Sequence, residues 1–227
     1  MLNVKRLAAV PLFQTLSPPR RQRLSDAAVI EFVKRGVVLF QQGNPAATMW
    51  VVLNGWVHLV RSGGTAADRP VVIFTITPAE TLCGISALAG GRYSVTAIAG
   101  THCQVARLPA ALLTEALTHE AAFTHAVLQL CIRRLQHIAQ QYGSMAEPVS
   151  HRLIRSLLRL RQQFGATVPV THRELAQMSW TTTESAIRIV RSLKQQGYVS
   201  GTRGQMTIAH PDGLEHLLSG SNGHGRL

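Results

Sequence analysis

The spacing of apolar residues changes twice along the chain and separates a β-rich N-terminal part from a helical C-terminal part. Residues 6–28 predict one short helix and the start of another at Pro18-Pro19. Between Val29 and Leu108, seven short runs rich in β-branched and aromatic residues alternate with turns that contain Gly, Pro or Asn-Gly. This pattern predicts an antiparallel barrel or sandwich. A small barrel is filled by side chains or encloses one small ligand.

A helical period replaces the β pattern from Pro109 to about Tyr142. Its apolar residues recur every seven positions in two series offset by three, which is the a/d pattern of a coiled coil. The predicted dimer seam consists of Leu128, Cys131, Leu135, Ile138, Tyr142 and Met145. Because Arg133 and Arg134 flank this narrow stripe, we expect a parallel helix pair in a homodimer, with packing on the chain's own barrel as the alternative. Glu147-Pro148 predicts the end of the helix and a hinge.

The region after the hinge predicts three helices and a hairpin. Residues 149–164 form one amphipathic pattern, and residues 171–199 predict two short helices joined by a turn at Ser179-Trp180. Capping boxes are expected at Thr171 with Glu174 and at Thr181 with Glu184. The buried face of the second short helix is predicted to be Ala186, Ile189, Val190 and Leu193, and Gly197 is expected to end that helix.

The outer face of this second short helix is basic, with Arg188, Arg191 and Lys194 against Glu184 alone. Two short strands around Gly201–Gly204 follow, with Arg203 at their tip. Two short helices and a hairpin in this order are typical of a winged helix-turn-helix, in which the second helix enters the DNA major groove. An ordinary helical hairpin is the alternative.

Charge and composition favour a nucleic-acid partner over a membrane or an active site. The net charge is +12, and residues 148–227 hold ten Lys or Arg against four Asp or Glu. No apolar run approaches the roughly 18 residues of a spanning helix, so we expect a soluble, cytoplasmic protein without membrane contact. The sequence lacks GxxxxGK, GxSxG and HExxH, and we therefore expect no enzyme activity. Three cysteines without C-x-x-C spacing argue against a disulfide framework and against a metal site.

Four stretches and the order of the parts resemble the cyclic-AMP receptor protein/FNR family of bacterial transcription regulators. The stretches are VPLFQTLSP (10–18), RGVVLFQQGNPAATMWVVLNGWVHL (35–59), AIAGTHCQVARLP (97–109) and residues 171–199. The resemblance implies an α+β fold with an antiparallel β-barrel of the cyclic-nucleotide-binding jelly-roll type, a long dimerisation helix and a winged helix-turn-helix. The expected domains are 1–108 for the barrel, 109–147 for the dimerisation helix and hinge, 148–218 for DNA binding, and 219–227 as a disordered tail.

The resemblance also implies a homodimer that reads a palindromic site in double-stranded DNA, contacts RNA polymerase and is gated by an unidentified effector. The family reads bases with Arg-Glu-x-x-x-Arg or Glu-x-x-Ser-Arg, and Glu184 and Arg188 match the shared Glu and Arg. Thr183 and Ile187 stand where the two forms have Arg and Ser, which predicts a TGA-like half-site core with altered flanking preference. Glu184 as a helix cap alone remains the alternative. Expected phosphate contacts are Thr171, Thr182, Arg191 and Arg203.

The tentative effector pocket departs from the family's cyclic-nucleotide cassette, which reads Gly-Glu-Leu and then Arg-Ser-Ala. The corresponding residues here are Gly84, Ile85, Ser86, Arg92, Tyr93 and Ser94. Ile85 stands in place of the ribose-binding Glu, and Tyr93 in place of the phosphate-binding Arg, with Arg92 one residue early. A shift of one residue in a strand turns a side chain to the other face. These differences argue against cyclic AMP as the effector.

Several other sensor chemistries are alternatives to cyclic AMP. An iron–sulfur cluster is not expected, because the family's version needs N-terminal cysteines and the first cysteine is Cys83. Haem is an alternative, and its axial-ligand candidates are His58 and His102, then Cys83, Cys103, His125, Cys131 and His137. Further alternatives are a thiol switch at Cys131, a ligand-independent regulator with a filled barrel, and a cyclic-nucleotide-type regulatory module that does not bind DNA.

Overall fold

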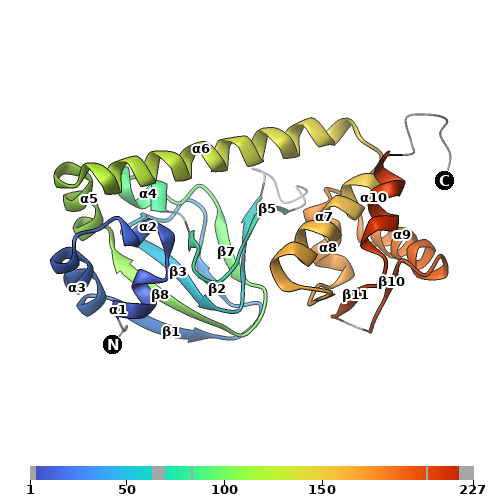
Figure 1. Ribbon diagram of the computed structural model, residues 1–227, viewed down its shortest axis with the longest axis horizontal. Coiled ribbons are helices and arrows are strands. Elements are labelled where there is room, and N and C mark those ends of the chain that lie inside the picture. The colour runs from blue at the N-terminus through green and yellow to red at the C-terminus, as the bar shows by residue number, and fades with distance from the viewer. Residues whose placement is uncertain (1–3, 63–69, 83, 203, 220–227) are drawn as a thin grey trace. The chain divides into compact units, whose positions relative to one another are not determined.

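The computed structural model describes residues 4–62, 70–82, 84–202 and 204–219. The chain divides into two compact units, Met1–Ala139 and Gln140–Leu227 (Figure 1). Two residues named above, Cys83 and Arg203, lie outside the described residues. The proposed domain boundaries at 108/109 and 147/148 stay predictions, since the division by contacts falls inside one long helix. Among the described helices, none is long and apolar enough to cross a membrane.

Three short helices open the first unit: α1 (Val4–Ala8), α2 (Pro11–Gln14) and α3 (Pro18–Asp26). Proline occupies the start of α2 and α3, where its missing N–H is no loss and its fixed φ suits the helix. The helices bury Leu7, Phe13 and Leu24, each at most 2% exposed. The sequence predicted helices in this region, and the structure adds one more.

Two four-stranded antiparallel sheets follow the helices. One has the order β1 (Val29–Val33), β8 (Cys103–Pro109), β3 (Thr48–Asn54) and β6 (Thr81–Leu82). The other has the order β2 (Val38–Phe40), β7 (Thr96–Ala99), β4 (Val57–Arg61) and β5 (Val71–Ile76). The seven predicted strands are all present, and β6 is additional. The α+β class with antiparallel sheets is therefore confirmed.

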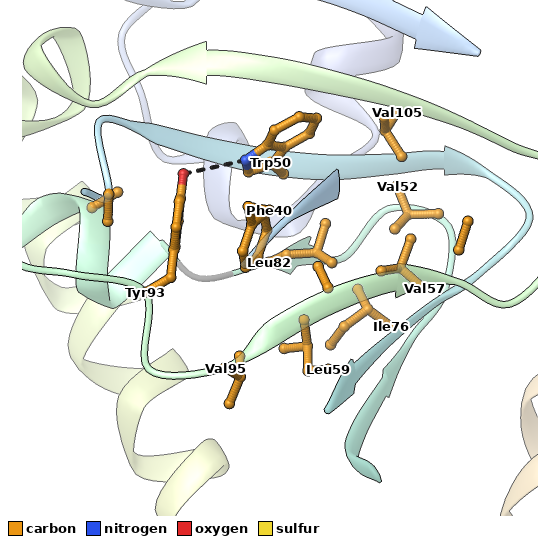
Figure 2. Close-up of a cluster of buried hydrophobic side chains, with 14 of the residues drawn as sticks. Phe40, Trp50, Val52, Val57, Leu59, Ile76, Leu82, Tyr93, Val95 and Val105 are labelled. Carbon is orange, nitrogen blue, oxygen red and sulfur yellow. Dashed lines mark hydrogen bonds between the residues drawn. The ribbon is translucent and has the colours of Figure 1, made fainter. Parts of the chain in front are cut away.

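Strand β3 has a core on each of its faces, because successive side chains of a strand point to opposite sides. Trp50 and Val52 belong to the core that fills the space between strands of the two sheets (Figure 2). Met49 and Val51 belong to a second core, which includes residues of the N-terminal helices. The space that a barrel ligand would use is thus lined by a continuous set of apolar side chains. The short helix α4 (Gly84–Leu88) adds Ala87 to it.

The predicted helical stretch after Pro109 is broken once, at Glu120, between α5 (Ala110–His119) and α6 (Ala121–Gly143). The Glu120 carboxylate accepts hydrogen bonds from the backbone N–H of Ser17 at 2.8 Å and from its hydroxyl at 2.5 Å. It also forms an ion pair with Arg20 at 2.9 Å. Burial alone would raise the pKa of Glu120, but the Ser17 hydrogen bonds and the nearby arginines outweigh it, so the pKa is lowered.

The second unit contains the end of α6, a 3-10 turn η1 (Ser144–Ala146) and the helices α7 (Val149–Phe164), α8 (His172–Met178), α9 (Thr183–Gln195) and α10 (Pro211–Ser219). A small sheet has the order β10 (Val199–Ser200), β11 (Met206–Ile208), β9 (Thr167–Val168). The expected helix at 149–164 is confirmed with both of its bounds. Ser219, the first residue of the expected disordered tail, ends α10 instead, and the rest of that tail lies outside the described residues.

Candidate nucleic-acid interface

Helix α8 is fixed at its start by the predicted capping box. The backbone N–H of Glu174 donates to the Thr171 hydroxyl at 3.2 Å, and the backbone N–H of Thr171 donates to the Glu174 carboxylate at 2.8 Å. Two of the helix's unpaired N–H groups are satisfied in this way. Leu175, Ala176 and Met178 are buried, as expected. Helix α8 therefore packs into the second unit, and the following helix, α9, presents the exposed face.

The turn between α8 and α9 corrects one expectation. Thr182 is the N-cap of α9, and its hydroxyl accepts from the backbone N–H of Ser185 at 3.1 Å. The predicted capping box of Thr181 with Glu184 is wrong, because α9 begins one residue later than expected. Thr181 instead uses its backbone N–H to bond the Ala176 oxygen at 3.0 Å inside the turn. Trp180 bends the chain here with φ of +52°, a conformation that L-residues rarely adopt.

Helix α9 separates a buried face from an exposed one. Ala186, Val190 and Leu193 are buried, and Ile189 is half-buried. Its exposed residues include Glu184, Ile187, Arg188 and Arg191, whose spacing of three and four places them along one side of the helix. Thr183, at the start of the helix, is half-buried. The structure therefore brings the candidate base-reading residues together on an accessible surface.

The candidate phosphate contacts have differing surroundings. The hydroxyls of Thr171 and Thr182 both hold helix caps, and both residues are half-buried. Arg191 is exposed on α9. Arg203 lies outside the described residues. Gly201, which follows β10, is tied to α9, since the Lys194 ammonium donates to the Gly201 oxygen at 2.9 Å. This role of Lys194 was not predicted from the sequence, because its partner lies seven residues away.

Gly201 is required where the hairpin begins. Its φ is +132°, and a Cβ atom there would lie 2.4 Å from the Gln205 oxygen. A larger residue would therefore force the two strands of the hairpin apart.

Burial and then the charge of Lys194 lower the pKa of His172, at the start of α8. The sequence gives no signal for this histidine, because its environment is set by burial and by a residue of another helix.

The predicted seam of α6 and η1 exposes large apolar side chains. Leu128, Leu135 and Tyr142 are 57%, 66% and 74% exposed, and Ile138 and Met145 are each 45% exposed. Cys131 is half-buried. Exposed apolar side chains at a/d positions are typical of a helix that pairs with another helix.

The side chains of the predicted effector residues have differing surroundings. Tyr93 is buried in the core beside Phe40 (Figure 2), and the two rings stack with centroids 4.0 Å apart. The Tyr93 hydroxyl donates to the Thr48 oxygen at 3.0 Å. Ile85 is 46% exposed on α4. Arg92 is exposed and donates to the Gly43 oxygen at 2.7 Å. Gly84 is buried, Ser86 half-buried and Ser94 exposed. The described residues thus do not provide the carboxylate and guanidinium pair of the cyclic-nucleotide cassette.

The haem-ligand candidates are also separated. His58 is buried on β4, whose neighbours Val57 and Leu59 belong to the core between the sheets, so His58 points to the opposite face. There its Nδ1 lies 3.1 Å from the Thr75 hydroxyl. His102 is exposed in the turn before β8. Cys103 is buried and donates to the Trp56 oxygen at 2.9 Å. A shared haem pocket is therefore not formed by these side chains.

The remaining candidates on α6 lie on different parts of that helix. His125 is exposed, whereas His137 stacks on Phe74 with ring centroids 4.9 Å apart. In the part of the chain that the structure describes, no group of three or more His, Cys, Asp or Glu side chains could hold a metal ion. Haem needs only one or two protein ligands, so haem stays a prediction.

Two family models match the chain, one in each unit. The model described as cyclic nucleotide-binding domain matches residues 30–120, and the Crp-like helix-turn-helix domain matches residues 151–217. The Thermus thermophilus cyclic AMP receptor protein is 26% identical over 216 residues, which cover 92% of this chain and 97% of that protein. The Synechococcus elongatus global nitrogen regulator is 22% identical, covering 84% of this chain and 90% of that protein.

Solved structures show the same fold. FixK2 from Bradyrhizobium japonicum has a TM-score of 0.75 at 15% identity, covering 84% of this chain and 96% of that chain. The c-di-GMP responsive global regulator CLP from Xanthomonas campestris has a TM-score of 0.71 at 18% identity, covering 85% and 99%. The order of the two matched domains and the exposed basic face of α9 agree with these similarities. The chain belongs to the cyclic-AMP receptor protein/FNR family of helix-turn-helix DNA-binding transcription regulators.

Proposed function

We propose that this regulator is a homodimer that reads a palindromic DNA site with TGA-like half-site cores through α9. One observation carries the proposal: Glu184 and Arg188 lie one helical turn apart on the exposed face of α9. A guanidinium can bond guanine O6 and N7 with two parallel hydrogen bonds, and a carboxylate can accept from cytosine N4. The pair therefore has the chemistry to read adjacent base pairs in a major groove.

The remaining candidate residues of α9 would set the flanking preference. Ile187 is 39% exposed beside Arg188 and has no polar atom in its side chain, so its favourable base contact is the methyl group of thymine. Thr183 has a hydroxyl at the first turn of the helix and can bond either a base edge or a phosphate. Arg191, one turn beyond Ile187, is suited to a phosphate.

Homodimerisation is supported by the exposed apolar stripe of α6. Two copies that pair through this stripe are related by a two-fold axis, so their DNA site would be palindromic. The two recognition helices would then need to lie about 34 Å apart, one turn of DNA. The experiment that tests the proposal selects binding sites from random DNA and compares the affinity of the protein for the selected site and for random sequence.

Arg188→Ala is expected to lower affinity for the selected site by about 1–3 kcal/mol and to change binding to random DNA much less. Arg61→Ala serves as the control, because Arg61 is an exposed arginine of the first unit. If Arg188→Ala leaves the ratio of the two affinities unchanged, α9 does not read the sequence. If the protein shows no salt-dependent binding to DNA, the result would instead favour a regulatory module that does not bind DNA, since phosphate contacts give a steep salt dependence.

We further propose that the effector is not cyclic AMP, although a relative is named a cyclic AMP receptor protein. Ile85 cannot replace a carboxylate that binds ribose hydroxyls, and the Tyr93 hydroxyl is already bonded inside the core. The aromatic cluster of Phe40, Trp50 and Tyr93 favours the ligand-independent alternative for the barrel. Titration calorimetry with cyclic AMP is expected to show no saturable heat, and micromolar binding would contradict this part of the proposal.

The localisation and one further partner complete the proposal. A transcription regulator acts where the chromosome is, so we place the protein in the cytoplasm. Contact with RNA polymerase follows from the family's regulatory role. Transcription in vitro from a promoter that carries the selected site would show activation or repression, and no change in transcript level would remove RNA polymerase as a functional partner.

A further inference from the structure

A groove of about 610 Å³ lies in the first unit, outside the core between the two sheets. Its wall comes from three segments that are distant in sequence: residues 10–12, the turn at 79–81, and α6. The residues of α6 that line it are His125, Ala126, Gln129, Leu130, Arg133 and Arg134. The groove shares no lining residue with the core that holds Tyr93, so it is separate from the family's cyclic-nucleotide site.

The groove combines an apolar wall with positive charge. Its apolar lining consists of the half-buried Leu130 and the outer edges of Val10 and Leu12, which are largely buried. The Arg134 guanidinium donates to the Thr81 oxygen at 2.9 Å and lies 4.5 Å from the centre of the Phe74 ring, so its position is fixed. Arg133 is exposed and also lines the groove. Two permanently charged guanidinium groups therefore border the same space.

Among the described residues that line the groove, Glu80 supplies the one carboxylate, and this carboxylate is already hydrogen-bonded. Glu80 accepts hydrogen bonds from the backbone N–H of Thr77 at 2.7 Å and from its hydroxyl at 2.8 Å. Its charge is thus partly satisfied within the turn at 77–80. The two arginines outweigh it, and the net charge of the groove lining is positive.

Dimerisation through the α6 seam would leave the groove open. With Leu128 at position a of the heptad, Gln129, Leu130 and Arg133 occupy positions b, c and f. These positions face away from the partner in a coiled coil. A partner α6 therefore does not supply an occupant for the groove.

We propose that this groove binds a small organic anion that has an apolar body. Ligand sites commonly measure about 300–1,000 Å³ and combine apolar walls with a few polar groups. The acidic group would pair with Arg133, since charge-assisted hydrogen bonds are the strong ones. The apolar body would lie on Val10, Leu12 and Leu130. This inference concerns binding alone and stands apart from the DNA function proposed above.

The test uses the full chain and two fluorescent probes, 8-anilinonaphthalene-1-sulfonate and its uncharged analogue N-phenyl-1-naphthylamine. We expect saturable binding of one sulfonate per chain and weaker binding of the uncharged analogue. Arg133→Gln is expected to weaken sulfonate binding about tenfold, the effect of losing one hydrogen bond to a charged group. Arg61→Gln, which changes an exposed arginine outside the groove, is expected to have no effect.

A second variant tests the location sterically. Gln129 is exposed, so Gln129→Trp should fold normally while filling the groove, and it is expected to abolish sulfonate binding. Circular dichroism and DNA affinity serve as checks of folding for each variant. Sulfonate binding that survives both Arg133→Gln and Gln129→Trp places the probe elsewhere and overturns the proposal. The absence of saturable binding by the unmodified chain also overturns it.

Discussion

Arg152 on α7 donates from Nε to the backbone oxygen of Ser179 at 3.0 Å, and so joins α7 to the turn of the helix-turn-helix. The same guanidinium donates from Nη1 to the backbone oxygens of Met145 at 3.0 Å and of Glu147 at 2.9 Å. Met145 lies in η1 and Glu147 directly follows it, at the predicted hinge. One side chain therefore holds the hinge and the DNA-reading turn together within the second unit.

Replacing this side chain should destabilise the second unit. Arg152→Met removes the charged donor and leaves carbonyl oxygens without it, which we expect to cost about 2 kcal/mol in the free energy of unfolding. Urea denaturation measures the effect. Arg155→Met is the matched control, because Arg155 bonds Glu147 in an exposed ion pair that should contribute less than about 1 kcal/mol. Equal losses in both variants would mean that Arg152 has no special role.

The start of α9 offers a comparison between two adjacent threonines. Thr182→Ala removes the hydroxyl that accepts from Ser185, and we expect a loss of about 1 kcal/mol in unfolding free energy. Thr181→Ala removes a side chain that does not cap the helix, and it should have a smaller effect. Thermal denaturation of both variants decides between them. A larger loss from Thr181→Ala would restore the capping box that the structure excludes.

Trp180 adopts a positive φ of +52° in the turn before α9. Glycine has no Cβ to strain there, whereas alanine retains the strain after losing the indole. We therefore expect Trp180→Gly to be more stable than Trp180→Ala by about 1 kcal/mol, as measured by urea denaturation. Comparing the two variants removes the contribution of the lost indole. Equal stability would show that the turn relaxes to negative φ in solution.

Glu120 should make the stability of the first unit depend on pH. Its pKa in the folded chain is lowered, so it stabilises the fold above the unfolded pKa of about 4.3, and this contribution is lost as pH falls through the lower folded pKa. Glu120→Gln should flatten the decline of stability in that acidic range. Glu215→Gln on α10 is the control. An unchanged pH profile for Glu120→Gln would show that the Ser17 and Arg20 contacts do not favour the ionised carboxylate.

The exposed stripe of α6 makes a prediction about assembly. Leu135 is 66% exposed, and Leu135→Glu would place two like charges at one level of the paired helices. We expect this variant to sediment as a monomer at concentrations where the unmodified chain is a dimer, in analytical ultracentrifugation. Gln136→Glu, the adjacent exposed position, should remain dimeric. A dimeric Leu135→Glu variant would move the interface away from this stripe.

The sequence predicted those elements whose signal is local and repeated. The helix at 149–164 follows from a strong apolar period and from Pro148 at its N-terminus, and the Thr171 capping box from two residues three apart. The base-reading candidates came from the family resemblance and from their common face on α9. Strand β6, with two residues, is too short to show any period.

Features that depend on distant contacts were not predictable in this way. The break at Glu120 depends on Ser17, which is 103 residues away in sequence. Three consecutive threonines gave no local reason to prefer Thr182 as the cap, and the bond from Thr181 to Ala176 decides it. The groove combines three segments, so its lining could not be identified before those segments were placed together.

The reading of DNA by α9 is tested most directly by combining a protein change with a base change. Affinity is measured for the unmodified chain and for Arg188→Ala, each with the selected site and with a site in which the guanine of the TGA core is replaced by adenine. If Arg188 bonds that guanine, the two changes share one interaction, and their combined loss should fall short of the sum by about 1–3 kcal/mol. Losses that simply add would contradict the contact and, with it, the proposed recognition of DNA by α9.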